Sequence, residues 1–326
     1  MDVLTDVLNS LHIQGALYFE VEAGQPWVLV NPPMNSIGSY MLPDVEHVIP
    51  FHIMLSGEGW AKSVSDSSPP VKLETGDVVM FPMGTSHSLT SNIDSWEGQP
   101  VDTSFYQQTA AKKQPFTAVK LGEDGTRSYL VCGYIGFNAK PLNTVLNTLP
   151  NMLVVKDHIN NDGLMKQLLL STLQEMRKSN ERAKSIVTKL TELIFTLALR
   201  QHMESHSDLD KQSWLSAIQD PCIGKALVLI HQAPFNKWTL AALANKCAMS
   251  RSSLAKRFNL YVGQPPMQYI NSWRMHLASR LLTDGMSILQ VTEHVGYSSE
   301  SAFQKSFKRY VGCTAGEWRT KYNKAS

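Results

Sequence analysis

The sequence predicts an α+β protein of two domains: an N-terminal β-barrel with a helical pair, and a C-terminal all-α domain in which a long helix joins two helix-turn-helix units. Three observations support this prediction. Short β-rich runs fill residues 16–137, helical periodicity takes over at 162–205, and an internal repeat lies within 237–318. The chain has 326 residues, 43% of them hydrophobic and 18% charged, which is enough for two separate cores.

The domain boundaries follow from changes of composition along the chain. We place the barrel at residues 1–158, the helical pair at 159–205, a linker at 206–219 and the second domain at 220–326. The linker contains the polar stretch SHSDLDKQ, which has little periodicity of any kind.

The barrel is predicted from apolar runs that are too short for helices. Between residues 16 and 137 these runs are ALYFEVEA, PWVLVN, HVIPFHIML, VVMFP and YLVCGYIGF, and clusters of Gly, Pro, Asn and Asp separate them. Many short strands with turn signals between them are typical of a β-sandwich or a β-barrel.

The helical pair is predicted from apolar side chains at helical spacing, with a break at Ser179-Asn180. Its second helix has more apolar side chains than one face needs: Ile186, Leu190, Leu193, Ile194, Leu197 and Leu199. Two interpretations stay open. Either the helix packs across the barrel, or part of this surface joins a second copy in a homodimer.

The charge is divided unevenly along the chain. The net charge is +2 overall, but residues 211–326 hold 15 Lys or Arg against 5 Asp or Glu, a net charge of +10, so residues 1–210 carry −8. A basic domain joined to an acidic one indicates that one half meets a polyanion. No basic leader precedes an apolar stretch and no apolar run approaches about 18 residues, so we expect a cytoplasmic protein with no membrane partner.

The cysteines Cys132, Cys222, Cys247 and Cys313 lie far apart and form no CxxC pair. This spacing supports neither a disulfide framework nor a structural zinc site, and buried free thiols are the simplest interpretation. Cys132 lies in the predicted barrel and not in the basic domain, and it is the candidate redox residue.

The internal repeat is the strongest signal in the chain. LAALANKCAMSRSSLAKRFNLYVG at 240–263 and ILQVTEHVGYSSESAFQKSFKRYVG at 288–312 each predict a short helix, a turn and a second helix. The first helices align at an offset of 48 residues, whereas Phe258 and Phe307 in the second helices align at 49. The second turn therefore contains one extra residue.

Caps and breakers set the bounds of the two units. Ser250 is the expected N-cap in the first copy, and Ser298 or Ser299 in the second. Between the copies, a stretch that begins with prolines and stops at Asp284-Gly285 predicts one connecting helix. We place the first unit at 239–261, the connecting helix at 265–283 and the second unit at 287–310.

Each second helix carries a polar stripe on the side away from its core residues. A solvated helical face would explain one such stripe, but two stripes on a domain of charge +10 favour double-stranded DNA as the partner. The stripes consist of Ser252, Ala255 and Lys256 in the first copy and Ser301, Gln304 and Lys305 in the second, with phosphate-neutralising charge from Arg251, Lys308, Arg309 and Arg319.

The segments SRSSLAKRF, GQPPMQYINSWRMHLASRLL and VGYSSESAFQKSFKRYVG resemble the DNA-binding domain of AraC/XylS-type regulators over residues 220–322. The resemblance implies that two tandem units enter adjacent major grooves on one face of the DNA. Ala255 departs from the polar residue often found at its position, and Glu300 is a poor neighbour for phosphate. The base-facing residues implied are Ser252, Ala255, Lys256, Glu300, Ser301, Gln304 and Lys305.

The segment GDVVMFPMGTSHSL fits the second motif of cupin barrels, G-x5-P-x-G-x2-H, with Gly76, Pro82, Gly84 and His87 in register. Its pattern predicts a strand, a tight turn and a returning strand whose His87 points into the barrel. The first cupin motif is only partly present, because metal-binding cupins have an HxH pair and a Glu where this chain has His52 and Met54.

These residues give two expectations for the barrel interior. A metal would need His47, His52 and His87 to converge, but His47 and His52 differ in strand parity unless a bulge forms near Pro50, so we expect no cofactor. A packed core with hydrogen-bonded histidines is one alternative, and an effector pocket is the other. The pocket would be formed by His52, Met54, Phe81 and His87.

The order of these parts resembles the cupin-containing regulators of the AraC/XylS family. The resemblance implies a homodimeric transcription regulator, with activation favoured, that binds promoter DNA, works with RNA polymerase and senses a small molecule or a redox signal. One alternative is a cupin-type metal-dependent enzyme with a DNA-localising domain, but the missing HxH pair and Glu argue against catalysis. The other is a constitutive DNA-binding protein whose barrel serves only for dimerisation.

Overall fold

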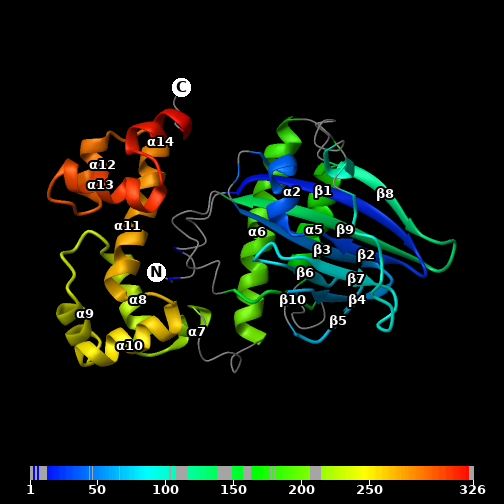
Figure 1. The fold of residues 1–326 in the computed structure, drawn as a ribbon, viewed down its shortest axis with the longest axis horizontal. Helices are drawn as coiled ribbons and strands as arrows, with labels where there is room; N and C mark the ends of the chain where they lie inside the picture. Colours follow the sequence, from blue (N-terminus) through cyan, green and yellow to red (C-terminus); the bar gives the residue numbers. More distant parts are fainter. Residues whose placement is uncertain are drawn as a thin grey trace. The chain divides into compact units, whose positions relative to one another are not determined.

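The chain forms two units, one rich in β-sheet and one helical (Figure 1). The first contains the strands with helices α2, α5 and α6, and the second contains helices α7–α14. Each unit is described by itself below. The computed structural model describes residues 13–43, 45, 47–65, 67–102, 104–107, 116–137, 149–156, 163–176, 178, 181–205 and 214–322, with Val3 and Asp6.

The strands of the first unit form two sheets, of order β10-β6-β3-β9-β1-β8 and β2-β7-β4-β5. Strand β1 pairs with β8 in parallel, and the other paired strands are antiparallel. The strands are β1 (Ile13–Gly24), β2 (Val28–Asn31), β3 (His47–Ser56), β4 (Glu58–Ser63), β5 (Val71–Glu74), β6 (Val78–Met80), β7 (His87–Thr90), β8 (Phe116–Gly122), β9 (Arg127–Phe137) and β10 (Leu153–Val155).

The two sheets enclose one apolar core, to which both contribute alternate residues. Leu29 and Leu89 point inward from the smaller sheet, and Val21, Met54 and Leu130 point inward from the larger one. Strand β3 is buried along most of its length, because its even-numbered side chains enter this core and the opposite face of the sheet is covered as well. The predicted barrel-like domain is confirmed.

Helix α6 (Glu181–Ser205) packs on the outer face of the larger sheet and contacts β1 and β10. The hydroxyl groups of Tyr18 and Thr191 hydrogen-bond there, and the rings of Phe137 and Phe195 lie 5.4 Å apart. Helix α5 (Leu164–Met176) packs against α6, and the short α2 (Met34–Met41) packs against β3. The predicted break at Ser179-Asn180 falls between α5 and α6 but lies outside the described residues.

The first interpretation of the apolar α6, that it packs across the sheet, holds for part of its surface. Ile194, Leu197 and Leu199 are buried, whereas Ile186 and Leu193 remain 46% and 42% exposed. The helix therefore packs across the sheet and still presents apolar side chains at the surface.

The helical unit consists of α7 (Trp214–Gln219), α8 (Ile223–Gln232), α9 (Leu240–Lys246), α10 (Arg251–Val262), α11 (Pro266–Thr283), α12 (Ile288–His294), α13 (Glu300–Val311) and α14 (Ala315–Tyr322). Residues 214–219 of the predicted linker are not a linker but helix α7, which packs on α8 and α10 through the fully buried Trp214. Residues 206–213 lie outside the described part. Within the described residues, no helix is both long enough and apolar enough to cross a membrane.

Candidate functional site

The first helix-turn-helix unit is built as its sequence predicts. The side chain of Thr239 accepts a hydrogen bond from the Ala242 amide at the start of α9, and Ser250 accepts one from the Ser253 amide at the start of α10. Between them, Ala248 takes a left-handed φ of 54° that reverses the chain. Helix α10 turns its buried residues Leu254, Phe258 and Val262 toward the core.

The second unit repeats this geometry almost residue for residue. Ser287 and Gln290 form a capping box at the start of α12, Gly296 takes the left-handed φ of 76°, and Ser299 accepts a hydrogen bond from the Ala302 amide. The Tyr297 amide donates to the carbonyl five residues earlier, as the Met249 amide does in the first unit. Both left-handed residues fit an offset of 48, so the extra residue is Ser298 and the cap is Ser299.

Helix α11 connects the two helix-turn-helix units, and the side of α11 that faces them is buried. The core of the second unit includes Met275, Ala278 and Leu282 from α11, together with Phe303 and Phe307. Phe258 of the first unit contacts Tyr269 of α11, with ring centroids 5.6 Å apart. The connecting helix predicted at 265–283 is thus confirmed within one residue.

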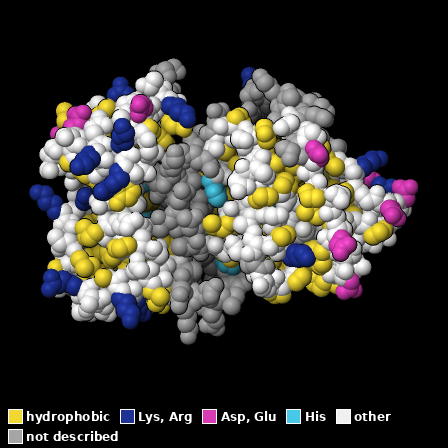
Figure 2. Space-filling view, in the orientation of Figure 1, with side chains coloured by type: hydrophobic (Ala, Val, Ile, Leu, Met, Phe, Trp, Pro, Cys, Tyr) yellow, Lys and Arg dark blue, Asp and Glu magenta, His cyan; other side chains and the backbone are white. Residues whose placement is uncertain are grey.

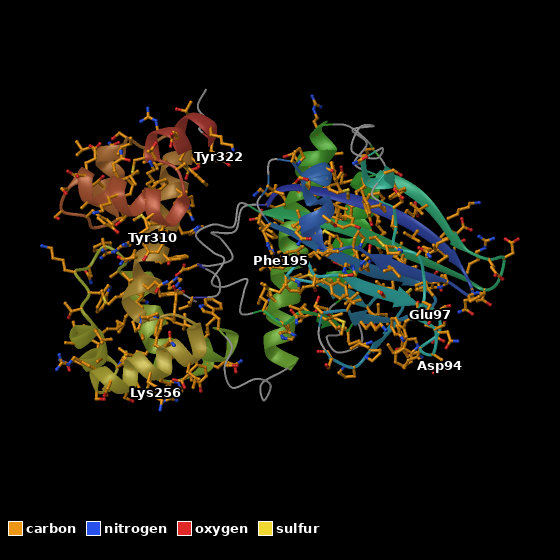
Figure 3. All side chains as sticks on the ribbon, viewed as in Figure 1. Asp94, Glu97, Phe195, Lys256, Tyr310 and Tyr322 are labelled. Atoms are coloured by element: carbon orange, nitrogen blue, oxygen red, sulfur yellow. The ribbon has the colours of Figure 1, made fainter. Side chains whose placement is uncertain are left out.

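The proposed DNA-contacting residues lie at the surface of α10 and α13. Figure 3 places Lys256 at the surface of α10, and Lys and Arg side chains are spread over the visible face of the helical unit (Figure 2). Arg309 lies over the ring of Tyr310, 4.9 Å from its centroid. Arg251, Ser252, Lys256, Glu300, Ser301, Lys305 and Arg309 are exposed, and Ala255 and Gln304 are half-buried.

Arg257 lies between these residues in sequence but serves the fold. Its guanidinium pairs with the carboxylate of Asp220, which is 5% exposed and also accepts hydrogen bonds from the Cys222 and Ile223 amides at 3.0 and 2.9 Å. This pair holds the start of α8 against α10. The positive charge of Arg257 is therefore neutralised inside the unit.

In the sheet-rich unit, three residues that the sequence named separately form one hydrogen-bonded chain. His52 Nδ1 lies 2.8 Å from the Cys132 sulfur, His52 Nε2 lies 2.8 Å from His87 Nε2, and His87 Nδ1 lies 2.9 Å from the Thr85 carbonyl oxygen. Since a carbonyl only accepts, His87 Nδ1 carries a proton and its Nε2 accepts from His52 Nε2–H. The Cys132 thiol then donates to His52 Nδ1.

This chain is neutral because it is fully buried. Burial lowers the pKa of His87 to about 4 and, with the neighbouring His87, holds the pKa of His52 well below its usual value. Burial also raises the pKa of the Cys132 thiol, which disfavours the reactive thiolate. In the described part of the chain, no cysteine forms a disulfide.

His47 does not join this chain. The register of β3 with β9 runs without a bulge from His47 to Met54, so His47 faces the opposite side from His52. Its Nε2 lies 2.6 Å from the Pro82 carbonyl oxygen. Among the described residues, no three His, Cys, Asp or Glu side chains are arranged to hold a metal ion.

The four residues assigned to an effector pocket are packed in the core of the sheet-rich unit. Phe81 stacks on His87 with ring centroids 3.8 Å apart, and Met54 is 1% exposed. Two hollows, of about 800 and 580 Å³, lie elsewhere: one beside Lys62 and Trp96, the other beside α2 and Thr85. Neither is lined by His52, Met54, Phe81 or His87, so the hydrogen-bonded core that the sequence left open as an alternative describes these residues.

Comparison with known proteins finds a matching family model for the sheet-rich unit and another for the helical unit. A family model described as Cupin matches residues 2–204, and one described as Helix-turn-helix domain matches residues 243–321. A putative AraC-like transcription regulator of Streptomyces antibioticus is 29% identical over 98% of both chains, and the HTH-type transcriptional regulator AlkR of Acinetobacter baylyi is 29% identical over 95% of this chain and 96% of its own. The solved structure of ToxT from Vibrio cholerae aligns with 97% of this chain and 98% of its own at 13% identity and a TM-score of 0.36.

Proposed function

The chain belongs to the AraC-type transcription regulators with an N-terminal cupin domain, and we propose that it inserts α10 and α13 into successive major grooves of promoter DNA. One observation carries this proposal. Two helices with equivalent caps and equivalent buried residues each leave a polar stripe exposed, with Lys256 and Lys305 at corresponding positions.

The side chains in the two stripes suggest different contacts. Gln304 and the serines Ser252 and Ser301 suit base edges, whereas Lys256 and Lys305 reach phosphates or guanine. Arg251 and Arg309 add phosphate-neutralising charge. Ala255 offers only an apolar contact, such as a thymine methyl group, and Glu300 suits a cytosine amino group better than a phosphate.

The test is salt-dependent binding to a duplex that the wild-type protein selects from a random pool. Lys256→Ala and Lys305→Ala should each weaken binding and lower the salt slope by about 1, because each removes one phosphate neutralisation. Lys225→Ala on α8 is the matched control, since Lys225 is exposed but lies on neither recognition helix. Equal affinity of all three variants and the wild type would refute the assignment.

We further propose that the sheet-rich unit senses a small molecule, and we place redox sensing through Cys132 second. The buried thiol, with its raised pKa, supports this order. Treatment with hydrogen peroxide distinguishes small-molecule sensing from redox sensing. If peroxide changes DNA affinity in the wild type but not in Cys132→Ser, the protein senses a redox signal instead.

We propose that the protein acts as a homodimer in the cytoplasm and activates transcription with RNA polymerase. The exposed apolar residues of the helical pair support the dimer, namely Leu164 and Leu170 on α5 and Ile186 and Leu193 on α6. Replacing Ile186 and Leu193 with Glu should shift sedimentation to a monomer, while Lys189→Glu on the same helix should not. An unchanged dimer in the double variant would exclude this surface.

A further inference from the structure

The loop between α8 and α9, residues 233–238, lies against both halves of the helical unit. It belongs to the first helix-turn-helix half by sequence, and the indole Nε1 of Trp238 closes it with a 2.9 Å hydrogen bond to the Ala233 carbonyl. Its other contacts reach the connecting helix and the second half. The loop therefore has a position from which it could tie the two halves together.

Arg274, in the middle of α11, holds this loop by its backbone. Its Nε donates to the Pro234 carbonyl and its Nη2 to the Asn236 carbonyl, both at 2.7 Å. The same guanidinium lies over the ring of Tyr297, 5.8 Å from its centroid, in the turn of the second unit. One rigid, planar cation on the connecting helix thus contacts both the first half and the second half.

Gly296 makes the second connection. A Cβ at this position would lie 2.4 Å from the carbonyl oxygen of Phe235, closer than real Cβ contacts allow. The turn of the second unit therefore approaches the backbone of the loop so closely that only glycine fits. This contact is independent of Arg274, but it joins the same two segments.

We propose that Arg274, the backbone of 234–236 and the Gly296-Tyr297 turn form a bracket that fixes the separation of the two recognition helices. In this role Arg274 is a positioning residue that selects the spacing between the two half-sites on DNA, not their base sequence. The inference rests on the proposed insertion of α10 and α13 into DNA.

The physical reason lies in how linked binding modules gain affinity. Two modules held at a fixed separation bind strongly to sites at that separation, and they lose the gain when the geometry forbids simultaneous contact. Loosening the bracket lets the halves adopt several separations. Affinity for the native spacing then falls, and the penalty for a wrong spacing falls with it.

The test measures full-length protein on three duplexes. The first is the duplex that the wild type selects from a random pool, the second has about 5 base pairs, or half a helical turn, inserted between the half-sites, and the third keeps one half-site only. The quantity compared is the ratio of affinities for the first and second duplexes. Arg274→Ala should lower this ratio by about tenfold and leave binding to the third duplex within about twofold of the wild type.

Two variants and a folding check make the outcomes decisive. Arg280→Ala removes a positive charge from the same helix outside the bracket, so it should keep the wild-type ratio even if overall affinity falls. Arg274→Lys keeps the charge but not the two-pronged hydrogen bonds, so it should behave more like Arg274→Ala, and it replaces that variant if circular dichroism shows loss of fold.

A folded Arg274 variant with the wild-type ratio would overturn the bracket. Equal losses on all three duplexes would also overturn it, because they would indicate a direct phosphate contact by Arg274. Failure of the wild type to select any duplex would refute the proposed function itself, which separates the two conclusions.

Discussion

The buried chain of Cys132, His52 and His87 predicts how the stability of the sheet-rich unit depends on pH. Both imidazoles are neutral in the folded protein, and burial lowers the pKa of His87 from 6.5 to about 4. In the unfolded chain the same side chain titrates near 6.5. The unfolded state therefore binds more protons than the folded state in the window between these two values.

The sign and size of the effect follow from this difference. Because His87 has its lower pKa in the folded state, its contribution is fully present above pH 6.5 and is lost as the pH falls toward 4. One pKa unit corresponds to about 1.4 kcal/mol, so the full loss is about 3 kcal/mol, of which about 2 kcal/mol is lost by about pH 5. The lowered pKa of His52 acts in the same direction.

Urea denaturation at several pH values, monitored by amide hydrogen exchange of the β3 and β7 peptides, measures the slope of the free energy of unfolding against pH. The exchange of these peptides reports on the sheet-rich unit. The comparison is a double variant with leucine at positions 52 and 87, which should lose most of the slope because both groups are removed together. Nitrogen-15 NMR of the imidazoles gives a second readout, with the proton expected on Nδ1 of His87 and on Nε2 of His52. A His87 titration near 6.5, or equal slopes in the two proteins, would refute the reasoning.

Three further predictions concern single positions. Ala248→Gly should raise the free energy of unfolding by about 0.5–1 kcal/mol, because glycine adopts the left-handed backbone without strain. Gly296→Ala should lower it by about 2 kcal/mol or more, because the new Cβ would collide with the Phe235 carbonyl. Thermal denaturation measures both changes. Asp220→Ala should lower the free energy of unfolding by about 1–2 kcal/mol in the same assay, because it leaves two helix-start amides without their acceptor and removes the partner of the half-exposed Arg257. In the folded protein, a maleimide reagent should label Cys132 at least about tenfold more slowly than the half-buried Cys222, and equal rates would contradict the buried thiol.

The helical unit was largely predictable because its signals are local. Ser250 and Ser299 can be recognised from the sequence as the N-caps of α10 and α13, and the repeated apolar positions mark the buried sides of these helices. The predicted linker was wrong at residues 214–219, because the local sequence there does not show that a helix forms. Trp214 is a large apolar residue beside a polar stretch, and only the contacts of α7 with α8 and α10 show that it is core.

The sheet-rich unit was predictable in kind but not in detail. Apolar runs located β1, β3 and β9, whereas β4 (Glu58–Ser63) has polar residues on its exposed face and gives no continuous run. The link between His52 and Cys132 depends on the pairing of β3 with β9, in which these two residues lie opposite each other. Register between strands 80 residues apart is a tertiary property, so sequence reasoning found both residues but not their contact.

The difference between the two turns of the repeat supports the bracket independently of Arg274. At equivalent left-handed positions the first unit has Ala248 and the second has Gly296. Backbone strain alone favours glycine at both, so it does not explain why only one position has it. The explanation lies in the surroundings: Ala248 has room for its Cβ, while the Phe235 carbonyl leaves none at Gly296. The repeat thus departs from symmetry where the second unit meets the loop of the first, which is the contact that the proposed spacing selection requires.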